Sequence, residues 1–131
     1  MAQWNIPADL KYTKTDEWIR LEGEEAIVGI SDYAQSSLST LTFVDLPKVG
    51  AAFKAGEQFG AVESTKAASE IYLPVAGTIT ATNTALENDP ETINNDPYGA
   101  GWLVRLKLAN AADINGLLDA AAYTKHCEER G

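Results

Sequence analysis

The sequence predicts a mainly β protein in which two packed sheets are accompanied by short helices and a C-terminal helix. About six to eight short runs of apolar, β-branched and aromatic residues alternate with clusters of Gly, Pro, Asn and Asp, which is typical of strands and turns. Helical spacing is confined to a short segment after residue 30 and to the end of the chain. With 131 residues and no linker, the chain suits one domain, residues 1–131, whose core spans about residues 12–110.

The N-terminal third predicts a hairpin, a short helix and a further strand. Trp18–Leu21 and Ala26–Ile30 are strand-type runs separated by a polar turn that contains a glycine. Ser31 and Asp32 can cap the start of one or two helical turns that end near residues 39–40. Leu41–Leu46 is rich in β-branched and aromatic residues and therefore predicts the next strand.

The C-terminal half predicts two more strands and the final helix. Thr78–Thr82 and Trp102–Leu108 have the length and composition of strands. Between them, Leu86–Gly101 is dense in Asn, Asp, Pro and Gly, which predicts a long ordered loop or a set of turns. The final helix, over about residues 119–129, can be capped by Asp119, and we expect its inward face to include Ala121, Tyr123 and Cys127.

The charge balance indicates which partners to expect. The net charge is −9 and the isoelectric point is near 4.4, so phosphate backbones and anionic lipid surfaces would repel the chain. Basic patches on other proteins would attract it. No run of 18 apolar residues occurs, and the N-terminus lacks the apolar segment of a secretory signal. We therefore expect a cytoplasmic protein with no nucleic-acid or membrane partner.

The residue inventory disfavours catalysis and metal binding. A single cysteine, Cys127, and a single histidine, His126, give neither a disulfide nor the spacing of a zinc site, and the free thiol fits a reducing compartment. No serine nucleophile motif and no glycine-rich phosphate loop occur. The chain is therefore expected to carry a chemical group rather than to transform one.

Lys66 is the residue best placed to carry such a group. Two strand-type runs, Phe59–Val62 and Ile71–Val75, enclose the polar segment Glu63–Glu70, which predicts a β-hairpin with Lys66 at the middle of its tip. Its neighbours are small, so an enzyme could reach the ammonium group. The chain has seven lysines, however, and most lysines are ordinary surface residues, so the surrounding pattern must decide.

That pattern resembles a known family. The segment ESTKA at residues 63–67, followed by PVAG at residues 74–77, resembles the lipoyl-lysine hairpin of lipoyl-bearing domains, and VGAAFKAG at residues 49–56 fits the same pattern. From about Tyr12 to Tyr123 the chain resembles the H-protein family of the glycine cleavage system. The matching stretches, in order, are YTKTDEW, VGISDYAQ, TFVDLPKVG, ESTKAASE and DPYGAGWL, which begin at Tyr12, Val28, Thr42, Glu63 and Asp96.

The resemblance implies a fold of the lipoyl-domain type, the barrel-sandwich hybrid, with lipoic acid attached to Lys66. It also implies a non-catalytic shuttle of aminomethyl groups. The donor would be a pyridoxal-phosphate-dependent glycine decarboxylase (P protein), and the acceptor a tetrahydrofolate-dependent aminomethyltransferase (T protein). Dihydrolipoamide dehydrogenase (L protein) would reoxidise the shuttle. A lipoate-attaching enzyme is a further implied partner, and we expect a monomer.

The family also implies a cleft on the body of the domain that shelters the loaded arm from water. The positions that match its hydroxyl and acids are Thr15, Glu17 and Glu70; the alternative interpretation of both acids is ordinary surface charge. The chain departs from the family at two places near this cleft or the hairpin. Thr65 stands where valine is common, and Ser39–Leu41 replaces an expected Gly-acid-hydrophobic run.

Three other kinds of protein could present a modified lysine on such a hairpin. A paralogue that relays lipoyl groups, or serves as an interaction module outside glycine cleavage, remains an alternative. A stand-alone lipoyl domain of a 2-oxoacid dehydrogenase would be shorter and would lack the matches at Tyr12–Gln35 and Asp96–Leu103. A biotinyl carrier would have methionine on both sides of the lysine, where this chain has Thr65 and Ala67.

Overall fold

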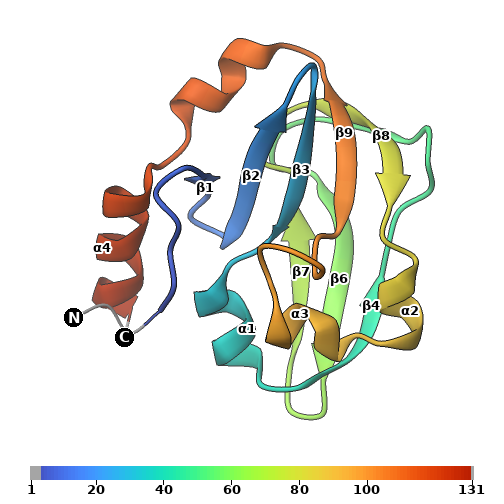
Figure 1. Ribbon diagram of the computed structural model, residues 1–131, viewed down its shortest axis with the longest axis vertical. Helices are drawn as coiled ribbons and strands as arrows, with labels where there is room; N and C mark the ends of the chain where they lie inside the picture. Colours follow the sequence, from blue (N-terminus) through green and yellow to red (C-terminus); the bar gives the residue numbers. More distant parts are fainter. Residues whose placement is uncertain (1–3, 131) are drawn as a thin grey trace.

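Residues 4–130 of the computed structural model are described below, and they form two antiparallel sheets that pack on one another (Figure 1). The six-stranded sheet has the order β1-β2-β3-β9-β8-β5; its strands are Lys11–Tyr12, Glu17–Glu22, Glu25–Ile30, Val104–Leu108, Gly77–Thr82 and Ala52–Phe53. The three-stranded sheet has the order β4-β6-β7; its strands are Leu41–Asp45, Gln58–Ser64 and Ala68–Tyr72. The predicted fold class is confirmed.

Helices connect these strands or follow the last of them. They are α1 (Asp32–Leu38), α2 (Ala85–Asn88), α3 (Glu91–Asn95), a 3₁₀ helix (Ala111–Gly116) and α4 (Ala120–Arg130). The expectation of a loop or a set of turns over residues 86–101 was therefore wrong in part, because α2 and α3 lie within or at the edge of that segment. Leu86 and Ile93 are buried in the core, and this burial stabilises two helical segments that a polar composition does not reveal.

The core has two parts. The larger one fills the space between the sheets, with apolar side chains such as Ile19, Val62, Ile71 and Leu106. The smaller one lies beneath α4, where the rings of Tyr12 and Tyr123 stack with their centroids 4.7 Å apart. Tyr123 and Cys127 face inward as expected, but Ala121 is exposed. Residues two positions apart in a helix are separated by about 200° around the helix axis. Ala121 therefore points away from the face that Tyr123 buries.

The predicted hairpin is present, with a shorter tip than expected. β6 and β7 remain paired as far as Glu63 and Ala68, so only Ser64–Ala67 form the turn, rather than the whole of Glu63–Glu70. Ladder hydrogen bonds join main-chain groups and continue through polar residues, which is why the apolar runs underestimated the strands. The hairpin projects from the body at the end opposite the β2–β3 turn (Figure 1).

The turns on either side of β5 contain the two glycines that the sequence placed there. Gly50 has a φ of 95° and Gly56 has a φ of 83°, which is the region where a Cβ atom is disfavoured. The main chain can therefore reverse twice within a few residues and deliver β6 to the three-stranded sheet.

Ser39 ends α1 in a conformation that suits glycine. Its φ is 67° and its ψ is −159°, a combination that residues other than glycine adopt at a cost of about 1–3 kcal/mol. Asn94 holds this conformation from α3: its amide nitrogen donates to the Ser39 carbonyl (2.8 Å), and its side-chain oxygen accepts from the Leu41 amide (2.9 Å). The departure at Ser39 therefore replaces a glycine at a position whose backbone requires one.

Ser39→Gly is expected to raise the free energy of unfolding by about 1 kcal/mol. Relief of strain exceeds the extra entropy that glycine gives the unfolded chain. Urea denaturation of the variant and the parent measures the difference. Ser36→Gly is the matched control, since Ser36 is exposed within α1 and the same change there should cost roughly half a kcal/mol. A Ser39→Gly variant less stable than the parent would contradict the interpretation.

Candidate functional site

Lys66 lies at a short, well-defined tip. The Ser64 amide donates to the Ala67 carbonyl (2.8 Å), and the Ala67 amide donates to the Ser64 hydroxyl (3.2 Å), so Thr65 and Lys66 are the two central residues of a closed turn. Both are exposed. The turn fixes the main chain while leaving the lysine side chain free to project into solvent, which suits recognition by a modifying enzyme.

A cavity of about 110 Å³ lies beside this hairpin. Its walls come from β6 and β7, from the turn before β2 and from α1; the lining residues are Thr15, Asp16, Glu17, Ile30, Ala34, Ser37, Leu38, Val62, Ser69, Glu70 and Ile71. Ser69 is three residues from Lys66, and even a fully extended chain spans only about 3.3 Å per residue, so the cavity begins within roughly 10 Å of the tip. The three residues predicted for the cleft, Thr15, Glu17 and Glu70, all line it.

Glu17 is the central polar group of the cavity and is only 1% exposed. Its Oε1 accepts hydrogen bonds from the hydroxyls of Thr13 (2.6 Å) and Thr15 (2.5 Å). Its Oε2 accepts from the main-chain N–H of Tyr72 on β7 (3.2 Å). Three donors on one carboxylate fix its position between the two sheets, so its orientation does not depend on solvent.

Burial raises the pKa of Glu17 from 4.5 to about 6, while the hydrogen bonds from Thr13, Thr15 and Tyr72 act in the opposite direction. The interpretation of Glu17 as an ordinary surface acid was therefore wrong. Glu70 differs, since its side chain is exposed at the rim of the cavity. Above about pH 6, where the Glu17 carboxylate is ionised, the cavity lining combines it with the side chains of Asp16 and Glu70 and with hydroxyl groups, which together favour a small cationic hydrogen-bond donor.

The sequence reasoning missed several residues of this site. Thr13 donates to Glu17 from four residues away, a local signal that the pattern Thr13-x-Thr15-x-Glu17 contains. Long-range packing brings Asp16 and the α1 residues to the cavity wall, and no local sequence signal indicates this. Thr65, one of the two departures, is simply exposed in the turn beside Lys66.

Neither a cluster of metal ligands nor a membrane-spanning helix is found among the described residues. Within residues 4–130, no cluster of three or more His, Cys, Asp or Glu side chains is arranged to hold a metal ion. None of the helices in this range combines the length and apolarity needed to cross a bilayer.

The two sheets and the projecting hairpin with a central lysine form the kind of fold that the resemblance to lipoyl-bearing domains implies. Comparison with known proteins identifies the member of the class. The sequence model of the family described as "Glycine cleavage H-protein" matches residues 10–130. The chain belongs to the glycine cleavage H-protein family.

Individual relatives agree with this assignment. The chain is 57% identical over 122 residues to the glycine cleavage system H protein of Opitutus terrae, covering 92% of this chain and 96% of the relative. It is 56% identical over 122 residues to that of Chromobacterium violaceum, covering 92% and 95%. Its fold is similar to the crystal structure of the glycine cleavage system H protein from Mycobacterium marinum, with a TM-score of 0.84 and 40% identity over 96% of this chain and 99% of that one.

The raised pKa of Glu17 predicts how the free energy of unfolding depends on pH. Because its folded pKa lies above the unfolded value, its favourable contribution is complete below about pH 4.5 and is lost as the pH rises through about 6. A difference of about 1.5 units is worth roughly 2 kcal/mol. Glu17→Gln removes this titration, so the free energy of unfolding of the variant, relative to the parent, should increase by about 2 kcal/mol between about pH 4 and pH 7. Urea denaturation at both pH values measures the difference between variant and parent. A difference that does not change with pH would contradict the raised pKa of Glu17.

Proposed function

We propose that this protein is the lipoylated shuttle of a glycine cleavage system, with the lipoyl group attached to Lys66. The observation that carries the proposal is the position of Lys66, exposed at the tip of a firm hairpin whose strand β7 leads to an acidic cavity. The P protein would load the arm with an aminomethyl group, the T protein would take the methylene group, and the L protein would reoxidise the arm. The chain itself would catalyse none of these steps.

The residues present fit this cofactor. The Lys66 amine can form an amide with a carboxylic acid, which removes the charge of the lysine and extends its side chain. Lipoate, when attached, supplies a disulfide that accepts the aminomethyl group and is reduced in doing so. The hairpin tip keeps the attachment point outside the core, so a partner enzyme can receive the arm without unfolding the domain.

The cavity residues would shelter the loaded arm. A cationic amine about 4 Å from the Glu17 carboxylate would gain a gross Coulomb energy of about 4 kcal/mol at an effective dielectric constant of 20. Removal of the amine and of the buried carboxylate from water offsets much of this gain, so the net contribution is far smaller. Thr15 would add a hydroxyl, and Glu70 a second negative charge at the rim. A modest affinity suits a shuttle, because the arm must also leave the cavity to meet the next enzyme.

The remaining features are consistent with a freely diffusing carrier. The net charge of −9 would guide the protein to basic surfaces on its partners. The relatives named above are bacterial proteins, which favours a cytoplasmic location. We further propose that residues 1–131 act as a single lipoyl-bearing domain and as a monomer, and that a lipoate-attaching enzyme recognises the Ser64–Ala67 turn.

Lys66→Arg is expected to abolish lipoylation, because the guanidinium does not form the amide. Incubation with a lipoate-attaching enzyme, lipoate and ATP should increase the mass of the parent protein by one lipoyl group, located on Lys66 by peptide mapping. Lys54→Arg is the matched control, since Lys54 is also an exposed lysine close to a tight turn. It should be lipoylated as fully as the parent. A lipoyl group on any other lysine would refute the assignment, and the melting temperature of Lys66→Arg should remain within about 1 °C of the parent.

Glu17→Ala is expected to speed the spontaneous loss of the aminomethyl group from the loaded protein. Removal of the buried carboxylate deprives the amine of its partner, and a loss of up to about 1.4 kcal/mol corresponds to as much as a tenfold faster decay. Release of formaldehyde and ammonia over time measures the rate. Glu63→Ala, which removes an exposed acid from the same hairpin outside the cavity lining, should leave the rate unchanged. Equal decay rates in the parent and in Glu17→Ala would show that Glu17 does not protect the aminomethyl group.

A further inference from the structure

The turn that carries Thr15 and Glu17 depends on an unusual backbone conformation at Asp16. Asp16 has a φ of 81°, which is disfavoured for a residue with a Cβ atom, although aspartate tolerates it better than most. Its amide donates to the Thr13 carbonyl (3.2 Å), and its carbonyl accepts from the Ser31 amide (2.9 Å). The conformation at Asp16 therefore sets the direction in which the two neighbouring cavity residues project.

Side chains from the C-terminal helix hold Asp16 from the other side. The Tyr123 hydroxyl donates to Asp16 Oδ1 (2.7 Å). The Arg130 guanidinium donates to both carboxylate oxygens, through Nη2 to Oδ1 (2.5 Å) and Nη1 to Oδ2 (3.2 Å). This two-point arginine contact restricts orientation as well as position. The Asp16 side chain is only 18% exposed in this pair, so solvent screens the contact less than at an open surface.

The same hydroxyl also reaches the opposite wall of the cavity. Tyr123 Oη and Ser31 Oγ are 2.6 Å apart, and Ser31 Oγ accepts from the Ala34 amide (3.2 Å), which caps the start of α1. Arg130 in addition lies over the ring of Tyr33, 4.4 Å from its centroid. Helix α4 is thus bonded to the Thr13–Glu17 turn and to α1, and both of these contribute walls to the cavity.

We propose that Tyr123 and Arg130 are positioning residues for the arm cavity: by holding Asp16, they fix the Thr13–Glu17 turn against α1 and aim Thr15 and Glu17 into the cavity. The inference rests on the proposed function, because it assigns a role in retaining the arm to a helix that contributes no residue to the cavity lining. It predicts that loosening the end of α4 opens the cavity without affecting Lys66.

The simpler role for α4 is to cover the smaller core cluster, in which Tyr123 and Cys127 are fully buried. That role rests mainly on Tyr123, whereas Arg130 is one-third exposed and meets the cluster only at its edge, at Cys127 Sγ (3.8 Å) and the ring of Tyr33. A variant at Arg130 therefore disturbs the core beneath α4 less than a variant at Tyr123 does. Tyr123 is less suitable for the test, because its stacking on Tyr12 contributes to stability in its own right.

The test is amide hydrogen exchange on the unlipoylated Arg130→Gln variant. The reporter is the Tyr72 N–H, which donates to Glu17 Oε2 and so senses the position of that carboxylate across the two sheets. Its exchange should become about fivefold faster, the effect of losing roughly 1 kcal/mol of local stabilisation. The reference is the Leu103 N–H, which donates to Val28 (2.9 Å) within the other sheet and should exchange at the parental rate.

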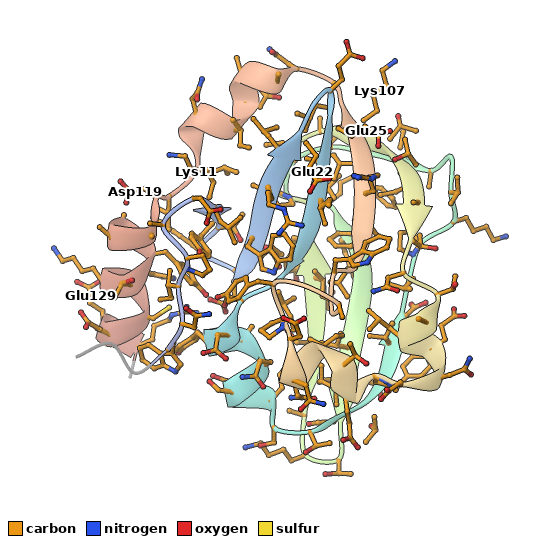
Figure 2. All side chains as sticks on the ribbon, viewed as in Figure 1. Lys11, Glu22, Glu25, Lys107, Asp119 and Glu129 are labelled. Atoms are coloured by element: carbon orange, nitrogen blue, oxygen red, sulfur yellow. The ribbon has the colours of Figure 1, made fainter. Side chains whose placement is uncertain are left out.

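Two further variants complete the experiment. Arg105→Gln removes an arginine of similar exposure, 31%, that pairs with Glu22 and Glu25, and it should leave Tyr72 exchange unchanged. Glu22 and Glu25 lie near the β2–β3 turn (Figure 2), at the end of the molecule opposite the hairpin tip. Arg130→Lys keeps the positive charge near Asp16 and should restore at least half of the protection.

The outcomes are distinct. Faster exchange at Tyr72 but not at Leu103 in Arg130→Gln, reversed in Arg130→Lys, supports the positioning role. Equal acceleration at Tyr72 and Leu103 indicates general destabilisation and overturns the proposal. Unchanged exchange at Tyr72 overturns it as well. When the arm carries an aminomethyl group, adding Arg130→Gln to the parent protein should speed the decay of that group. Adding the same change to Glu17→Ala should have no further effect, because both changes act through one carboxylate. Lipoylation of Lys66 should be normal in every case. Failure of lipoylation in the parent would instead count against the proposed function, while the exchange result would still stand.

Discussion

The carboxylate of Glu17 is the polar contact on which the geometry of the site depends. It belongs to β2 of the six-stranded sheet, and it accepts from the Tyr72 amide on β7 of the other sheet. Burial of an unpaired carboxylate would cost several kcal/mol, so its position is stable only because three donors surround it. The same bond ties the base of the hairpin to the body. The orientation of the hairpin and the shape of the cavity therefore share one cause.

The hairpin and the body have different physical roles. The tip at Thr65 and Lys66 contributes no buried apolar surface, so its sequence is free to serve recognition rather than stability. The strands beneath it bury Val62 and Ile71 in the core and supply the rigidity that a displayed lysine needs. The proposed acyl arm on such a rigid tip would sample a limited volume, and β7 leads from the tip to the lining of the cavity.

Much of the fold could be predicted from the sequence, because alternation of apolar residues and turn-forming residues are local signals. The strand pair at Trp18–Leu21 and Ala26–Ile30 and the Ser31 cap of α1 show this directly. The position of Lys66 at a hairpin tip was predictable from the pattern of strands, and the position of Glu17 beside the cavity only from the resemblance to a family. The burial of Glu17 and the contact between Asp16 and Arg130 were not predictable, since they join residues 55 and 114 positions apart and depend on how the sheets and α4 pack. Short helices such as α3 were not predicted, because buried residues, here Ile93, stabilise a segment whose composition favours turns.

The raised pKa of Glu17 would couple binding of the proposed amine in the cavity to the release of a proton. Near pH 6 the carboxylate is protonated in a substantial fraction of molecules, and a cationic amine binds only the ionised form. Binding of the amine must then expel the proton, and by reciprocity a lower pH must weaken binding by the same factor. At neutral pH most of the carboxylate is already ionised, so the proposed arm could dock without prior release of a proton. Glu17 thus combines two opposing effects: burial would exclude water from a bound amine, while hydrogen bonds from protein donors keep the pKa low enough for the carboxylate to be charged.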